Sequence, residues 1–220
     1  MKTIDSIKSL ALTLLIVAGF ALKGTEAHAA QTETLTVAGG CFWCVEADFE
    51  KVPGVKEVVS GYTGGSVSNP SYKQVVTGNT GHYEAVQIQF DPDVVSREAL
   101  LNDFLRSVDP TDAGGQFCDR GDSYRTAIFV FNAQEKALAQ AVLAKAQAEL
   151  GQAIVTPILS AGTFYEAEAY HQDYYKSSGL VITRAGPKTK ASAYKFFRQA
   201  CGRDQRVRQL WGNAAPFAGS

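Results

Sequence analysis

The chain has 220 residues, and its 21 Lys and Arg against 22 Asp and Glu give a net charge of −1. This balance excludes a long-range attraction to nucleic acid or anionic lipid, so neither is expected as a partner. The length supports one domain with a hydrophobic core of its own.

The first 29 residues are predicted to be a secretory signal peptide. Lys2 and Lys8 form a basic start, residues 10–22 are apolar, and residues 27–29 read Ala-His-Ala, the A-x-A pattern of a cleavage site. The apolar run is shorter than the roughly 20 residues that cross a bilayer, which favours cleavage over a membrane anchor. We therefore expect export to the periplasm or outside the cell, without stable membrane association.

Strands and helices interleave along the remaining chain. The patterns predict strands over 35–38, 55–62, 83–90, 126–131 and 153–159, and helices over 41–51, 96–108, 133–150 and 190–200. Residues 109–122 are polar and Gly-rich and are predicted to form a functional loop, while residues 166–176 are predicted to be short, helical or irregular, and dense in aromatics. The alternation predicts an α+β fold, a two-layer α/β sandwich with a mixed sheet, flanking helices and a ferredoxin-like core. A single catalytic domain is expected over 30–220, with a mobile tail from about residue 200, and the protein is expected to be a monomer.

Cys41 follows two glycines at the predicted end of a strand and stands at the start of a predicted helix. The helix dipole and free backbone N–H groups stabilise a thiolate there, so we predict that Cys41 is a nucleophile. Phe42 and Trp43 could line an apolar pocket beside it. Cys44 lies one helical turn away and could trap an oxidised Cys41 sulfur as a disulfide.

Four cysteines in an exported protein admit other interpretations. Cys41-Phe42-Trp43-Cys44 also fits a thioredoxin-type thiol–disulfide oxidoreductase. A non-catalytic, disulfide-stapled binding module is a further alternative, and it would have all four cysteines paired. With one C-x-x-C and no paired histidines, no metal is expected. His82 and His171 are expected to be structural hydrogen-bonding residues, and the basic segment 195–208 is expected to be a solvated face.

Several motifs together resemble the A-class peptide-methionine sulfoxide reductases, in order over about 35–175. They are Gly40-Cys41-Phe42-Trp43 with Glu46, Gly61-Tyr62-Thr63-Gly64-Gly65, Asn69-Pro70-Ser71-Tyr72, Gly81-His82-Tyr83-Glu84-Ala85-Val86, Asp119-Arg120-Gly121-Asp122-Ser123-Tyr124-Arg125 and Tyr170-His171-Gln172-Asp173-Tyr174.

The resemblance implies that Cys41 attacks the sulfur of a methionine S-sulfoxide, free or in a protein, while Phe42 and Trp43 hold its methyl group. The product at Cys41 would be a sulfenic acid, which a second thiol converts to a disulfide. An external dithiol of the thioredoxin type would restore the enzyme, and no bound cofactor is expected.

For the sulfoxide oxygen, the resemblance implies that Glu84 is the general acid and that Tyr72 and Tyr124 donate hydrogen bonds. A carboxyl in an apolar pocket has a raised pKa and can hold a proton near neutral pH. Asp119 matches a carboxylate near the nucleophile, with a less defined role.

The sequence departs from the family pattern mainly at the resolving cysteine, the residue whose thiol converts the Cys41 sulfenic acid to a disulfide. Many family members have glycine at the position of Cys44. Both Cys44 and Cys201 are candidates. Residues three apart on a helix lie close together, whereas Cys201 would need its tail to fold back. Because disulfides require Cα atoms within about 7 Å, Cys44 is favoured as the first resolving residue. Cys118 could be a buried small hydrophobic residue or a relay.

Overall fold

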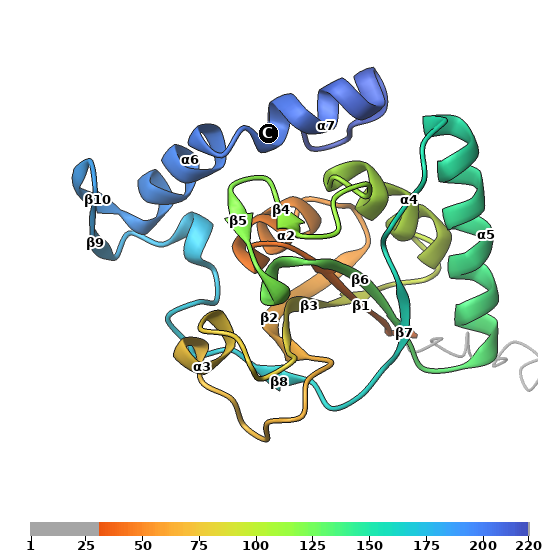
Figure 1. Ribbon diagram of the computed structural model, residues 1–220, viewed down its shortest axis with the longest axis horizontal. Helices are drawn as coiled ribbons and strands as arrows, with labels where there is room; N and C mark the ends of the chain where they lie inside the picture. The colour runs from red at the N-terminus through yellow and green to blue at the C-terminus, as the bar shows by residue number, and fades with distance from the viewer. Residues whose placement is uncertain (1–30, 220) are drawn as a thin grey trace, which may run out of the picture. The chain divides into compact units, whose positions relative to one another are not determined.

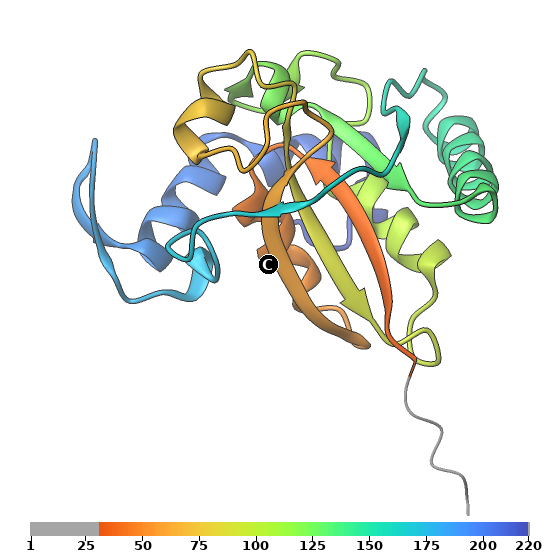
Figure 2. The same ribbon diagram turned by 90° about the horizontal axis from the view of Figure 1, so that it is seen from below.

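Six strands form a mixed sheet at the centre of the computed structural model, which describes residues 31–219 (Figures 1 and 2). The strands are β1 (Glu33–Gly39), β2 (Val55–Thr63), β3 (Tyr83–Phe90), β6 (Thr126–Val130), β7 (Ile158–Ser160) and β8 (Tyr165–Glu166). Their order is β7-β6-β1-β3-β2-β8, and every pair is antiparallel except β6 with β7. The sheet is therefore mixed, as predicted.

Helices flank this sheet. The helices that pack directly on it are α2 (Phe42–Phe49), α4 (Arg97–Ser107) and α5 (Ala133–Leu150). The others are α3 (Tyr72–Val76), α6 (Lys190–Ala200) and α7 (Arg203–Trp211). Ser96 begins α4 as its N-cap, where its hydroxyl accepts a hydrogen bond from the Ala99 amide at 3.1 Å. Asn132 caps α5 in the same way, and Gly151 in the left-handed conformation ends it. Two small hairpins, β4 (Gly115–Gln116) with β5 (Asp119–Arg120) and β9 (Leu180–Thr183) with β10 (Gly186–Thr189), complete the set. Figures 1 and 2 show the second hairpin projecting away from the sheet beyond α6.

The core follows from the two-residue period of the strands. Val86, Ile88 and Phe90 on β3 point to the helical side, where they pack with Phe49 of α2 and Phe104 of α4 in the large hydrophobic cluster. The intervening Ala85 joins a smaller cluster on the opposite face. Glu84 is in phase with the core-facing residues, so the strand pattern itself turns this carboxyl toward α2.

The predicted α+β fold with flanking helices is confirmed, with two local differences. Strand β7 begins only after Pro157, because proline has no amide hydrogen to donate to a neighbouring strand. The Pro157 carbonyl still accepts a hydrogen bond from the Ile128 amide at 3.0 Å. It is an edge strand, as expected. Where a mobile tail was expected from about residue 200, the chain forms α7, which buries Val207 and Trp211 against the core.

The predicted signal peptide lies outside the described residues. Among residues 31–219, no helix is both long enough and apolar enough to cross a membrane.

Candidate active site

Cys41 stands between the end of β1 and the first turn of α2, as predicted. The preceding Gly40 has φ +79°, and a Cβ there would lie 2.5 Å from Cβ of Gln116. Only glycine tolerates both the left-handed backbone and this close approach. The Gly39-Gly40 pair thus lets the chain turn tightly from strand to helix and places Cys41 at the C-terminal end of β1, in the interior of the sheet order.

A small cavity of about 80 Å³ brings the predicted substrate-facing residues together. It is lined by Cys41, Phe42, Trp43, Tyr72, Glu84, Asp119 and Tyr124. These residues come from the N-terminal end of α2, from α3, β3 and β5, and from the 3-10 turn Asp122–Tyr124 that follows β5. The cavity therefore places a thiol, two carboxyls, two phenols and two aromatic side chains around one small volume.

Glu84 is the deeply buried carboxyl of this cavity, with 2% of its surface exposed. Its Oε2 accepts a hydrogen bond from the Phe42 amide at 3.1 Å, at the N-terminus of α2. Burial raises the pKa of Glu84 to about 8, although the Phe42 hydrogen bond works in the opposite direction. At neutral pH the carboxyl thus holds a proton that it can donate to a ligand in the cavity.

The thiols of Cys41 and Cys44 are free and hydrogen-bonded to each other. This hydrogen bond lowers the pKa of Cys44 to about 7, and the nearby Arg203 and Arg198 also favour its thiolate. The same hydrogen bond, with burial and the charge of Glu84, raises the pKa of Cys41. The helix N-terminus was expected to lower the pKa of Cys41, but these effects outweigh it. Two adjacent buried thiols hold one negative charge more easily than two. The pair together supplies the thiolate.

Tyr72 and Tyr124 face Glu84 from two different segments. Tyr72 begins α3, whose N-cap Ser71 forms a capping box with Gln74. The backbone amide of Tyr72 donates a hydrogen bond to Glu168 Oε1 at 2.9 Å. Burial and the neighbouring Glu84 raise the pKa of both phenols, so both keep their hydroxyl protons as donors.

Aromatic rings form the wall behind the cavity. Trp43 stacks on Tyr174 with ring centroids 3.7 Å apart, and His171 packs 5.1 Å from Phe42. Burial lowers the pKa of His171 to about 4, which keeps it neutral. His82 hydrogen-bonds Gly65 N and Val67 O, as expected, whereas neither His171 ring nitrogen has a hydrogen-bond partner within 31–219, contrary to expectation.

Glu46 holds this wall in place. Its buried carboxylate accepts hydrogen bonds from the Ser60 hydroxyl at 2.8 Å and from the Asp173 amide at 2.6 Å. Asp173 immediately precedes Tyr174, the ring that stacks on Trp43. Sequence patterns showed that residues 166–176 were dense in aromatics, but no spacing linked them to Glu46 or Trp43.

A second cavity, of about 210 Å³, adjoins the first and shares Cys41, Trp43 and Asp119 with it. All four cysteines line it, and Cys118 and Cys201 form a disulfide there. The alternative of Cys118 as a buried hydrophobic residue is wrong, because Cys118 is exposed and its sulfur is bonded. Cys201 ends α6 beside the nucleophile, so α6 brings it to the site without a flexible tail.

Two buried arginines border the second cavity. Arg203, 2% exposed, donates to the carbonyl of Gly39 at 3.3 and 3.4 Å, and Arg198 pairs with the fully buried Asp48 at 2.9 Å. The expectation that 195–208 is a solvated face is therefore wrong for these two residues, because α6 and α7 turn them inward. Burial raises the pKa of Asp119, and the charge of Arg203 opposes this rise.

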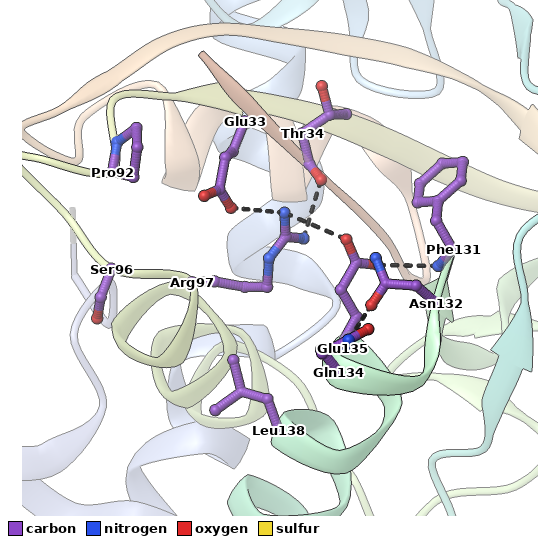
Figure 3. A pocket seen from close by; sticks show the side chains of 10 residues that line it. All are labelled: Glu33, Thr34, Pro92, Ser96, Arg97, Phe131, Asn132, Gln134, Glu135 and Leu138. Atoms are coloured by element: carbon purple, nitrogen blue, oxygen red, sulfur yellow. Dashed lines mark hydrogen bonds and ion pairs between the residues drawn. The ribbon is translucent and has the colours of Figure 1, made fainter. Parts of the chain in front are cut away.

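A much wider groove of about 800 Å³ lies where β1, α4 and α5 begin (Figure 3). Arg97 lies along it, donating to Glu33 at 2.8 Å and to the Thr34 carbonyl at 2.9 Å, and its guanidinium is 3.5 Å from Glu135. At its centre one guanidinium faces two carboxylates, and its lining holds no thiol. The reactive side chains lie in the two smaller cavities.

Comparisons with known proteins agree with this arrangement. Residues 33–209 match the family model described as peptide methionine sulfoxide reductase. The peptide methionine sulfoxide reductase MsrA 2 of Rhizobium meliloti is 46% identical over 193 residues, which is 88% of this chain and 90% of the relative. The Bacillus subtilis MsrA is 48% identical over 183 residues, which is 82% of this chain and 96% of the relative.

Solved structures show the same fold. Reduced Mxr1 of Saccharomyces cerevisiae matches with a TM-score of 0.62 and 32% identity, over 69% of this chain and 88% of that one. Methionine sulfoxide reductase A of Corynebacterium diphtheriae matches with a TM-score of 0.62 and 31% identity, over 74% and 83%. The chain belongs to the peptide methionine sulfoxide reductase family, and it is an enzyme that reduces methionine sulfoxide. This finding, with two free cysteines, excludes a purely stapled binding module.

Proposed function

We propose that Cys41 attacks the sulfur of a methionine S-sulfoxide, free or within a protein, in the 80 Å³ cavity. The supporting observation is that this one cavity gathers a thiol, a protonated carboxyl, two phenols and two aromatic side chains around one small volume. The attack forms a bond between the Cys41 sulfur and the substrate sulfur, while a proton reaches the sulfoxide oxygen. The protonated oxygen then passes to the Cys41 sulfur as the sulfur–sulfur bond and the bond between the substrate sulfur and the oxygen break. The two electrons that Cys41 loses stay on the substrate sulfur, so methionine leaves and Cys41 becomes a sulfenic acid.

Glu84 supplies that proton, since its raised pKa keeps it protonated at neutral pH. Tyr72 and Tyr124 donate hydrogen bonds to the sulfoxide oxygen, and Phe42 with Trp43 contacts the methyl group. Asp119 borders the site without an assigned proton transfer. The deprotonated Glu84 recovers a proton from solvent before the next turnover.

Cys44 is the first resolving residue in this proposal. Its thiolate attacks the Cys41 sulfenic sulfur, forms the Cys41–Cys44 bond and expels hydroxide, which becomes water on protonation. The hydrogen bond between the two free thiols and the positive charge of Arg203 and Arg198 support this assignment. An external thioredoxin-type dithiol returns two electrons to the enzyme.

The test is one turnover of the pre-reduced enzyme with one equivalent of a methionine S-sulfoxide peptide, followed by alkylation and peptide mapping. The expected first bond joins Cys41 and Cys44. A first bond between Cys41 and Cys201 would overturn the choice of Cys44. Glu84→Gln serves as the matched variant, in which the same bond should form far more slowly.

Export to the periplasm or beyond, and a monomeric state, are also part of the proposal. The export proposal is supported by the basic, apolar and Ala-His-Ala pattern of residues 1–29. Cell fractionation and the N-terminal sequence of the mature protein test export, and light scattering tests the monomer. A protein that still begins at residue 1 and stays in the cytosolic fraction would contradict export.

A further inference from the structure

The hairpin of β9 and β10 carries an apolar face that is open to solvent. Leu180 is 79% exposed and Ile182 is 91% exposed, the highest values for large hydrophobic side chains among residues 31–219. Pro187 lies directly opposite Ile182 in the antiparallel register and is also exposed. These three residues are called the hairpin face below. Because they are contiguous on an element that projects from the molecule, they are typical of an interaction surface (Figures 1 and 2).

The opposite side of the hairpin is packed. Val181 packs against the buried cluster that contains Tyr174, and the alternation along β9 therefore turns the hairpin face outward. Lys188, the partner of Val181 in the register, lies over the Phe196 ring of α6 at 5.4 Å. These contacts fix the hairpin to the domain and leave its outer face uncovered.

The base of the hairpin lies beside the active site. Lys190 follows β10 directly, and its Nζ is 5.3 Å from the centroid of the Tyr174 ring. That ring stacks on Trp43, which lines both cavities, at 3.7 Å. On the neighbouring α6, Phe197 is 38% exposed and lines the 210 Å³ cavity together with Cys41. The apolar surface is therefore continuous with the wall of the active site.

A methionine S-sulfoxide within a protein brings a polypeptide chain to this wall. The 80 Å³ cavity holds the end of one side chain, so the flanking residues of the substrate stay outside and lie on the surface around it. We propose that the hairpin face is a docking surface for an extended segment of the oxidised protein, one that combines apolar side chains with carboxylates. This inference rests on the proposed attack by Cys41 in the 80 Å³ cavity.

The charges around the hairpin set the sign of the partner. Residues 174–203 include seven Lys and Arg and no Asp or Glu. Of these, Arg184 at the tip of the hairpin and Lys195 on α6 are exposed, and neither has a carboxylate partner among residues 31–219. Lys188 contacts only an aromatic ring. Unpaired cations beside an apolar face attract a segment that carries carboxylates, and they repel one that carries lysines.

The position of the hairpin favours a substrate segment over the other possible occupants. An anionic bilayer or a second copy of this chain would also suit a basic and apolar face, but neither requires a thiol beside it. A polypeptide substrate does, because its oxidised methionine enters the cavity while its neighbouring residues lie on the rim. The contact through Lys190 and Tyr174 joins the hairpin to that rim.

Two substrates of different length test the docking surface. The short one is N-acetyl-methionine S-sulfoxide amide. The long one places the same residue between segments of apolar and glutamate residues, each of about ten residues, or roughly 33 Å when extended. Leu180→Ser/Ile182→Ser should raise KM for the long peptide about tenfold, as loss of interface side chains does, with kcat unchanged. Both constants for the short substrate should stay at their wild-type values.

Val94→Ser is the matched control, because Val94 is also apolar and 63% exposed but lies on the segment before α4. It should leave KM for both substrates unchanged. An unchanged KM for the long peptide in the hairpin variant would overturn the docking surface. An equal rise for both substrates would overturn it too, because the hairpin would then only support the cavity wall. No turnover of the short substrate by the wild type would instead overturn the proposed function of Cys41.

Reversing charge tests the chemistry of the segment. In the wild type, the glutamate peptide should have a KM about tenfold lower than the same peptide with lysine in place of glutamate, and added salt should reduce the difference. Arg184→Glu/Lys195→Glu should remove or invert this preference without affecting the short substrate. Equal KM values for the two peptides in the wild type would overturn the assignment of an acidic segment.

Cross-linking identifies the occupant directly. A photoreactive benzoylphenylalanine introduced in place of Leu180 should cross-link to the long peptide during turnover. Cross-linking to a second copy of the chain instead would assign the face to self-association and overturn the proposal. Sedimentation of the wild type, but not of Leu180→Ser/Ile182→Ser, with phosphatidylglycerol vesicles while KM for the long peptide is the same in both would assign it to a lipid surface, with the same consequence.

Discussion

The two cavities on either side of Cys41 differ in what surrounds the sulfur. The smaller one, about 80 Å³, presents a protonated carboxyl and two phenols, while the larger one, about 210 Å³, presents cysteines and arginines. Proton donors suit the loss of an oxygen atom, and positive charge suits thiolates that exchange. The difference supports the proposal that Cys41 meets the substrate in the smaller cavity and its sulfur partners in the larger one.

Replacing the residue shared by both cavities should have the largest effect. Cys41→Ser should lower the rate of sulfoxide reduction by at least about a thousandfold, because no other described thiol lines the smaller cavity. Steady-state assays with dithiothreitol as the reductant measure this rate, and circular dichroism checks that the variant is folded. Turnover within tenfold of wild type would mean that another thiol attacks the substrate.

A substitution confined to the smaller cavity should have the next largest effect on the rate. Glu84→Gln removes the proton donor and should lower the rate of the first chemical step by about a hundredfold to a thousandfold. In the wild type this step should slow as pH rises through about 8, because Glu84 then loses its proton. The variant should lack this decline, and a retained decline would assign the proton to another group.

A change confined to the larger cavity should have a smaller effect on a later step. Arg203→Leu removes positive charge that favours the Cys44 thiolate, so formation of the Cys41–Cys44 disulfide should slow about tenfold at pH 7. The pH at which this step reaches half its maximum should rise by about one unit. Arg203→Lys, which keeps the charge, should restore much of the rate. Equal loss in both variants would point to packing.

The last comparison concerns stability rather than rate, at the aromatic wall behind the smaller cavity. Burial raises the pKa of Glu46 from 4.5 to about 7, so the folded protein binds its proton more tightly than the unfolded chain does. Its contribution to stability is complete below pH 4.5 and is lost as pH rises through about 7. This loss amounts to about 3 kcal/mol of the free energy of unfolding. Glu46→Gln should flatten the pH dependence of urea unfolding over that range, and an unchanged slope would contradict the assignment.

Local signals were sufficient for the regular elements. The alternation in 83–90 predicted β3, and Ser96 with Gly151 predicted the limits of α4 and α5, because caps and periodicity depend on neighbouring residues. The same signals missed α7. Its burial of Val207 and Trp211 depends on a partner surface far away in the chain.

The sequence by itself predicted the residues that line the smaller cavity. Its motifs indicated Cys41, Glu84, Tyr72 and Tyr124, and the alternation along β3 set the face of the sheet on which Glu84 lies. The tertiary structure alone decided the pairing of Cys118 with Cys201, 83 residues apart, and the inward position of Arg203. Pairing between distant residues depends on how helices pack against loops, and no local spacing encodes that geometry.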